Sequence, residues 1–192
     1  MTQAIPSTDV TKTEFGFWIY LMTDLILFAT LFATYAVLKN NTFGGPGGHE
    51  LFNMPFVLTE TMLLLTSSYT SGLGILAAHR LDKRKVLLWF GITALLGLAF
   101  VSMELYEFHH LYVEGNSWRR SGFLSAFFTL VGTHGLHISI GLLWMTTLLV
   151  KVYRKGLSTA TIRKLSLLSM FWHFLDVVWI FIFTIVYLIG VA

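Results

Sequence analysis

The 192-residue sequence contains no cysteine and few charged residues, since Asp, Glu, Lys and Arg together make up only 12% of it. The absence of cysteine excludes disulfides, thiolate-bound copper, iron–sulfur clusters and thiol catalysis. The low charge stands against 55% hydrophobic and 16% aromatic residues, which leaves too little polar surface to cover a water-soluble globule. The composition therefore predicts an integral membrane protein.

Five apolar runs are long enough to cross a bilayer as helices, because a hydrocarbon core of about 30 Å needs about 20 helical residues. The predicted spans cover residues 17–38, 56–78, 86–110, 123–150 and 168–191. Residues 1–14 are predicted to form a polar cytoplasmic tail, since the apolar run after them is too long for a cleaved signal. The glycine-rich connection around Pro46 is predicted to be an exposed loop. We expect an all-α polytopic bundle, with residues 15–192 as a single membrane domain and no soluble catalytic domain in its short connections.

The basic residues fall unevenly on the two sides of this bundle. One side carries Lys12, Arg80, Lys83, Arg84, Lys85, Lys151, Arg154, Lys155, Arg163 and Lys164. The other side carries only Lys39, Arg119 and Arg120. The positive-inside rule then predicts a cytoplasmic N-terminus and a periplasmic C-terminus. The pI near 9.2 is interpreted as a record of this orientation, with loop ends touching anionic head groups, and not as a nucleic-acid surface.

Polar side chains inside the predicted spans are the candidate functional residues, because they are costly in lipid and must face a protein interior. They are Asp24, Glu60, Glu104, Glu107, His109, His110, His134, His137, His173 and Asp176. Three pairs are separated by three residues, which places both members on one helix face. These pairs are Glu104 with Glu107, His134 with His137, and His173 with Asp176.

Depth along the spans divides these residues into two candidate clusters. The cluster on the cytoplasmic side of the midplane is predicted to contain Asp24, His137, His173 and Asp176, with His134 close by. The outer cluster is predicted to contain Glu60, Glu104, Glu107, His109 and His110, with the two arginines at its rim. We also expect His173 and Asp176 to orient the last helix by contacts with the histidines of the preceding span.

Residue chemistry alone leaves several functions open for these side chains. Glu107 and His110 have the Glu-x-x-His spacing of di-iron bundles. A b-type haem held between His134 or His137 and His173 is another possibility. Buried acids and histidines also occur in transporters and proton relays, although no internal repeat and no Gly-Pro interruption is visible here. The remaining alternative is a framework of interhelical hydrogen bonds in a subunit of a larger complex.

Two long motifs carry a specific resemblance. F-W-H-F-L-D-V-V-W-I-F, at residues 171–181, resembles the C-terminal signature of subunit III of haem–copper respiratory oxidases. G-T-H-G-L-H-I-S-I-G, at residues 132–141, is similar to the motif that this family has in the preceding helix. E-L-Y-E at residues 104–107 and G-F-W-I-Y-L-M-T-D at residues 16–24 match further family segments. Within the family, the five-span form is most similar to the bacterial bo-type ubiquinol oxidase branch.

The resemblance implies a subunit without a redox centre or metal of its own. Haem and copper are expected in the partner, subunit I, and this chain is expected to brace that subunit, hold phospholipid in a cleft and support sustained proton uptake in a bacterial inner membrane. The electron donor is expected to be ubiquinol, with cytochrome c as the alternative. The resemblance further implies a buried carboxyl at Asp24 and no catalytic residue.

The candidate site residues then fall into three groups. Buried carboxyls related to protons or lipid are Asp24, Glu60, Glu104 and Glu107. The interhelical polar framework consists of His134, His137, His173 and Asp176. Aromatic residues of the lipid cleft or of the membrane interface are Trp18, Tyr20, Trp172 and Trp179.

Overall fold

The structure is a computed structural model that describes residues 7–42, 44 and 53–191. All regular secondary structure within these ranges is helical. The helices are α1 (Ser7–Leu38), α3 (Met54–His79), α4 (Lys83–Val113), α5 (Gly122–Lys155) and α6 (Thr159–Ile182), followed by the π-helix η1 (Phe183–Leu188) and the short α7 (Ile189–Val191). Five helical segments in the described part of the chain are long and apolar enough to cross a membrane. The prediction of an all-α membrane bundle with five spans is therefore confirmed.

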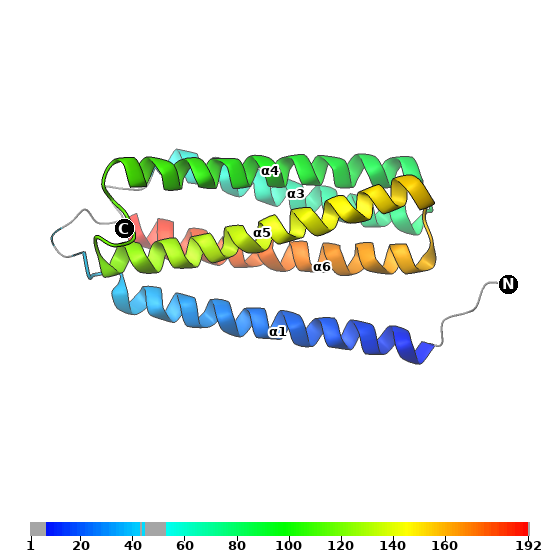
Figure 1. The fold of residues 1–192 in the computed structure, drawn as a ribbon, viewed down its shortest axis with the longest axis horizontal. Helices are drawn as coiled ribbons and strands as arrows, with labels where there is room; N and C mark the ends of the chain where they lie inside the picture. Colours follow the sequence, from blue (N-terminus) through cyan, green and yellow to red (C-terminus); the bar gives the residue numbers. More distant parts are fainter. Residues whose placement is uncertain (1–6, 43, 45–52, 192) are drawn as a thin grey trace.

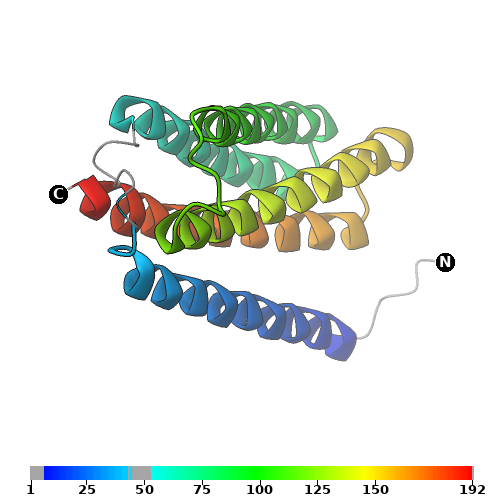
Figure 2. The same ribbon diagram turned by 60° about the vertical axis from the view of Figure 1, so that its left-hand side comes forward.

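Helices α3, α4, α5 and α6 form a closely packed group, and α1 lies along one side of it (Figures 1 and 2). Within the group, α3 packs on α4 and α6, and α5 packs on α4 and α6. Helix α1 contacts mainly α5 and, over a smaller area, α6. The first helix is therefore the least embedded part of the bundle.

All five helices begin before the predicted spans, three of them by no more than three residues and two of them by nine or more. Helix α1 begins at Ser7, inside the segment expected to be a tail, and α6 begins at Thr159, before the expected start at residue 168. For α6 the reason is local, because the Ser158 hydroxyl accepts a hydrogen bond from the Thr161 amide and so caps the helix. Gly156 ends α5 just before it with a positive φ of 75°, a conformation that glycine adopts without strain.

Two further helices begin at side-chain caps, and one begins with a proline. Asp82 accepts a hydrogen bond from the Lys85 amide at the start of α4, and this bond lowers the pKa of the Asp82 carboxyl. Ser121 caps α5 through the Leu124 amide. Pro55 lies in the first turn of α3, where its missing N–H is not needed. The predicted glycine-rich loop falls mostly on residues outside the described ranges.

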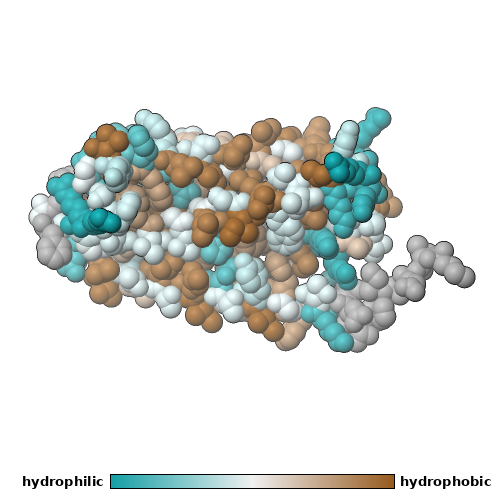
Figure 3. Space-filling model, in the orientation of Figure 1, coloured by the Kyte–Doolittle hydropathy of each residue, from teal (hydrophilic) through white to brown (hydrophobic). Residues whose placement is uncertain are grey.

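The outer surface fits a membrane environment. Hydrophobic residues cover much of the middle of the face shown in Figure 3, and hydrophilic residues gather toward its two ends. Large apolar side chains project outward from several helices, including Leu95 and Leu98 of α4 and Leu136 and Leu143 of α5. A water-soluble protein seldom exposes so much contiguous apolar surface. The chain is therefore a multi-pass membrane protein.

Small residues let the central helices approach one another. The buried Trp172 ring of α6 lies against Gly97 of α4 and Gly141 of α5. A Cβ atom built on Gly97 would lie only 2.8 Å from the Trp172 ring, whereas one built on Gly91 would meet nothing within 4 Å. Gly91, Ala94 and Gly97 are spaced by three residues along α4, and of these Gly97 is the position where close helix packing depends on glycine.

Candidate functional site

The buried polar residues do not form two clusters, as the sequence analysis predicted, but four groups. The cytoplasmic-side cluster divides into an Asp24–His137 pair, an aromatic enclosure around His134, and a Ser68–His173–Asp176 group. The first two groups adjoin, because Phe28 packs against both His134 and His137. Of the residues predicted in the outer cluster, the three glutamates Glu60, Glu104 and Glu107 do lie together.

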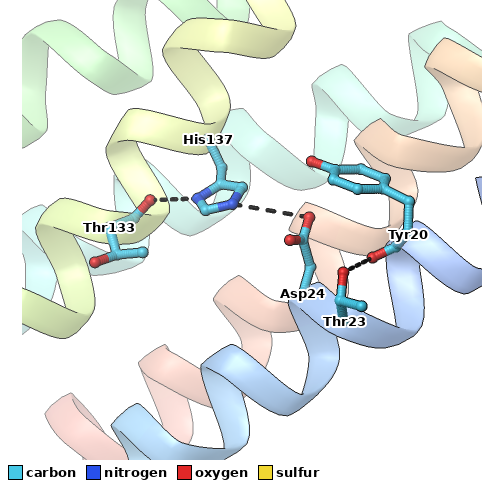
Figure 4. A network of polar contacts seen from close by, with 5 residues as sticks. All are labelled: Tyr20, Thr23, Asp24, Thr133 and His137. Atoms are coloured by element: carbon cyan, nitrogen blue, oxygen red, sulfur yellow. Dashed lines mark hydrogen bonds and ion pairs between the residues drawn. The ribbon is translucent and has the colours of Figure 1, made fainter.

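The first group joins α1 to α5. His137 Nε2 lies 3.8 Å from Asp24 Oδ2, which is within ion-pair distance but beyond a direct hydrogen bond. The His137 Nδ1 atom is 2.7 Å from the Thr133 carbonyl oxygen, and this contact orients the imidazole toward α1 (Figure 4). The Tyr20 side chain lies beside Asp24 in the same view. Asp24 is only 7% exposed, so α1 holds its one intramembrane carboxyl against the rest of the bundle.

The second group is an aromatic enclosure around His134, which is fully buried. The imidazole stacks on Trp179 with 5.2 Å between ring centroids, and the edges of Phe100 and Phe28 close the sides at 6.0 and 6.3 Å. Neither ring nitrogen has a hydrogen-bond partner among the described residues. His134 therefore fills a core position.

The third group lies between α3 and α6. His173 Nδ1 is 2.6 Å from the Ser68 hydroxyl, and the Asp176 carboxyl interacts with both of these side chains. The expectation that His173 and Asp176 contact the histidines of the fourth span is therefore wrong. Both residues face α3, because the rotation of α6 directs its other face, with Trp172 and Trp179, into the core.

The fourth group gathers three carboxyls in the other half of the bundle. The Tyr187 hydroxyl, on the π-helix η1, donates to Glu107 Oε2 at 2.9 Å, and Glu104 lies against Gly135 of α5. Glu60 is fully buried and close enough to the other two glutamates to interact with them electrostatically. Burying carboxyls in an apolar surrounding is costly, which marks these three side chains as candidate functional residues.

The two histidines predicted beside these glutamates lie elsewhere. His109 and His110 are exposed, and His110 Nε2 pairs with Glu114 at 3.3 Å. Glu107 and His110, which have the di-iron spacing, therefore do not converge.

Two of the four expected cleft or interface aromatics are core residues. Trp172 and Trp179 are 1% and 0% exposed, and their indole nitrogens donate to hydroxyls of α3, namely Ser67 at 3.0 Å and Thr61 at 3.1 Å. The physical reason is that α6 is buried on this face against both α3 and α5. Trp18 and Tyr20 are partly exposed on α1, and Trp18 lines a groove.

The sequence analysis missed the hydroxyl residues of α3. Ser67, Ser68 and Ser71 bond to Trp172, His173 and Ser169 of α6, and Thr70 bonds to Thr93 of α4. Their signal in the sequence is the run T-S-S-Y-T-S at residues 66–71, in the middle of an apolar span. Hydrogen bonds of this kind hold membrane helices in register.

The candidate ligands in the described part of the chain do not converge on a haem or a metal ion. Within the described ranges, no three His, Asp or Glu side chains are arranged to hold a metal ion. The three histidines considered for an axial pair have different neighbours, since His134 is enclosed by aromatic rings, His137 lies beside Asp24 and His173 bonds to Ser68. The arrangement suits hydrogen bonding between helices and proton retention.

Known proteins match nearly the whole chain. The family described as cytochrome c oxidase subunit III matches residues 6–191. Cytochrome bo(3) ubiquinol oxidase subunit 3 of Pseudomonas aeruginosa is 56% identical over 179 residues, covering 93% of this chain and 86% of that one. Cytochrome c oxidase subunit 3 of Bacillus sp. strain PS3 is 50% identical over 193 residues, covering 98% and 93%. The chain therefore belongs to the cytochrome c oxidase subunit III family.

Proposed function

We propose that this chain is the non-redox subunit III of a proton-pumping ubiquinol oxidase in the aerobic respiratory chain of a bacterial inner membrane. The observation that carries the proposal is the 56% identity, over 93% of the chain, to a subunit named for ubiquinol oxidase. Haem and copper belong to the partner subunit I, which this chain braces. The bond of His173 to Ser68 supports a role in the interhelical framework for that residue, and the aromatic rings around His134 support a packing role for it in place of ligation.

Lipid retention is the second part of the proposal. A groove of about 380 Å³ lies between α1 and α6 and is lined almost entirely by apolar side chains, including Trp18, Leu25, Phe174 and Phe181. Grooves of this size and composition suit hydrocarbon chains. Because α1 rests on the bundle through few contacts, a lipid in this groove would stabilise its position and protect the Asp24–His137 pair.

The orientation is proposed from the charges at the two ends of the bundle. The N-terminal part of α1, the α3–α4 turn and the α5–α6 connection lie at one end, and the C-terminus lies at the other (Figure 1). Ten of the 13 lysines and arginines belong to the first of these ends. The positive-inside rule places that end in the cytoplasm.

The electron donor decides between this function and the second candidate, cytochrome c oxidation. The second candidate is favoured by the 50% identity to a cytochrome c oxidase subunit 3. Oxygen consumption by the purified complex, supplied in parallel with ubiquinol or with reduced cytochrome c, separates the two. We expect turnover with ubiquinol, and turnover with cytochrome c alone would refute the assignment.

A further inference from the structure

A charged hollow lies at the start of α5, at the end of the bundle opposite the strongly basic one. Its volume is about 440 Å³, and it is lined by Trp118, Arg119, Arg120, Ser121, Gly122 and Ser125. The end of α1 lies beside the start of α5 (Figures 1 and 2), and the Phe123 amide donates to the Asn41 carbonyl oxygen at 3.2 Å. The hollow therefore brings two guanidinium groups to the point where two membrane helices meet the surface.

The two arginines of the hollow have hydrogen-bonding capacity to spare. Arg120 is held in place because its guanidinium donates to Asn116 Oδ1 at 2.7 Å, and Asn116 is buried. A guanidinium has several other N–H donors, which this bond leaves available. Arg119 is exposed, and neither arginine pairs with a carboxylate among the described residues. The hollow thus presents positive charge that the described part of the chain does not neutralise.

The basic residues of this end gather at one corner of the bundle. Of the 13 lysines and arginines, only Lys39, Arg119 and Arg120 belong to this end. Lys39 directly follows Leu38, and the Leu38 side chain lies 3.4 Å from a Cβ atom built on Gly122. All three basic residues of this end therefore belong to the junction between α1 and α5, where they favour an anionic ligand.

Aromatic residues place this corner at the level of the lipid head groups. Trp118 and Tyr112 are both exposed, and their rings stack with 6.1 Å between centroids. Exposed Trp and Tyr side chains at the ends of membrane spans are typical of the boundary between hydrocarbon and head groups. The neighbouring arginines are therefore within reach of lipid phosphates.

An apolar groove leads from the hollow toward the bilayer centre. It lies between α1 and α5, has a volume of about 130 Å³, and is lined by Leu31, Thr34, Leu38, Ser125, Ala126 and Thr129. Ser125 lines both the groove and the hollow, so the two adjoin. From Leu38 to Leu31 the groove descends about 10 Å, at 1.5 Å per residue. A ligand that fills both spaces has an anionic head and an apolar chain.

We propose that this corner binds an anionic phospholipid, such as phosphatidylglycerol, with its phosphate on Arg119 and Arg120 and one acyl chain in the groove between α1 and α5. Guanidinium groups bind phosphate oxygens in a bidentate manner, and the positive end of the α5 dipole adds to the attraction. The same arginines repel the ammonium group of a zwitterionic head, so the site prefers a lipid with net negative charge. A carboxylate of a neighbouring subunit would fill the hollow alone and leave the groove empty.

This site is separate from the groove between α1 and α6, because the two share no lining residue. It does not depend on the electron donor of the complex. The proposed orientation assigns it to the periplasmic leaflet.

Two matched pairs of variants test the head and the chain separately. Arg119→Gln removes a charge from the hollow, and Arg154→Gln removes an exposed charge near the other end of α5. Thr34→Phe fills the groove, and Thr30→Phe places the same side chain outside it. Both threonines are exposed and their hydroxyls bond to carbonyls of their own helix, so both phenylalanine variants are expected to fold.

The test is native mass spectrometry of the whole oxidase complex, depleted of lipid in detergent and titrated with phosphatidylglycerol. We expect a tightly bound lipid whose Kd rises about tenfold in Arg119→Gln and in Thr34→Phe, equivalent to about 1.4 kcal/mol. Arg154→Gln and Thr30→Phe should leave this Kd unchanged. Phosphatidylethanolamine should bind about tenfold more weakly. Inorganic phosphate and glycerophosphoglycerol, which has no acyl chain, should not compete at equal concentration.

Several results would overturn the proposal. They are an unchanged Kd in Arg119→Gln, equal Kd values in the two phenylalanine variants, and competition by inorganic phosphate as effective as competition by the lipid. Absence of tightly bound phosphatidylglycerol, with Arg119 protected from phenylglyoxal by a neighbouring subunit, would assign the hollow to a protein contact instead. An incorrect orientation is seen separately in reporter fusions, because binding in detergent does not depend on which leaflet the site faces.

Discussion

At the scale of single residues, several buried polar groups in this chain are held by hydrogen bonds to specific partners on other helices. The hydrogen bond from Tyr187 to Glu107 is one of these, and both residues are buried. Tyr187→Phe leaves the ring in place and removes the donor, so Glu107 Oε2 loses its bond. We expect a loss of about 1 to 3 kcal/mol in the free energy of unfolding, which is typical of an unsatisfied buried acceptor.

Tyr106→Phe is the matched control for this substitution, because the Tyr106 side chain is 64% exposed. Its effect should stay within about 0.5 kcal/mol. Unfolding of the purified chain by sodium dodecyl sulfate, followed by circular dichroism, measures both variants. Equal unfolding midpoints for Tyr187→Phe and Tyr106→Phe would show that the Tyr187–Glu107 hydrogen bond does not contribute to stability.

The Asp24–His137 pair gives a second prediction at this scale. Asp24→Asn keeps the size of the side chain and removes the carboxyl that lies 3.8 Å from His137 Nε2. If the pair supports sustained turnover without taking part in the chemistry, the initial rate of oxygen reduction should be unchanged and the active lifetime of the complex should fall. Successive oxygen-electrode traces of one preparation measure both quantities.

Asp82→Asn is the control for the lifetime experiment. Asp82 lies outside the spans at the start of α4, and asparagine is an equally good N-cap. Its active lifetime should therefore match that of the unmodified complex. Immediate loss of all oxygen reduction in Asp24→Asn would contradict a supporting role for this carboxyl.

At the scale of helices, the distance between α4 and α6 depends on Gly97. In Gly97→Ala the new methyl group meets the Trp172 ring, which cannot move freely because its indole nitrogen bonds to Ser67. Overpacking of this kind costs about 1 to 3 kcal/mol. Gly91→Ala, on the same helix, enters open space and should be neutral or stabilising by up to about 1 kcal/mol. Thermal inactivation of the complex compares the two, and a Gly97→Ala complex as stable as Gly91→Ala would refute the close contact.

The helices themselves were predictable, because their apolar length is a property of the local sequence. The early start of α6 had a readable signal in Gly156 and Ser158, which mark a helix end and a helix cap. The run T-S-S-Y-T-S at residues 66–71 marks the hydroxyl residues of α3, but it does not show which of them contacts His173. Spacing shows that His173 and Asp176 share a face, but the rotation of α6 about its axis decides that this face meets Ser68 and not the histidines of α5. That rotation depends on the packing of Trp172 and Trp179 against three other helices.

At the scale of the whole molecule, the bundle has one strongly basic end, and this asymmetry predicts its direction in the membrane. With five spans, alkaline phosphatase fused after Ala192 should be active, because it folds only outside the cytoplasm, and green fluorescent protein fused there should be dark. Fusions after Leu157, in the α5–α6 connection, should give the reverse. Replacing Lys83, Arg84 and Lys85 by glutamine should weaken this bias, since each basic residue near the membrane surface contributes about 1 kcal/mol to its interaction with anionic lipid. Active phosphatase at the α5–α6 connection would contradict the proposed orientation, and it would also place the Asp24–His137 pair in the periplasmic half of the membrane.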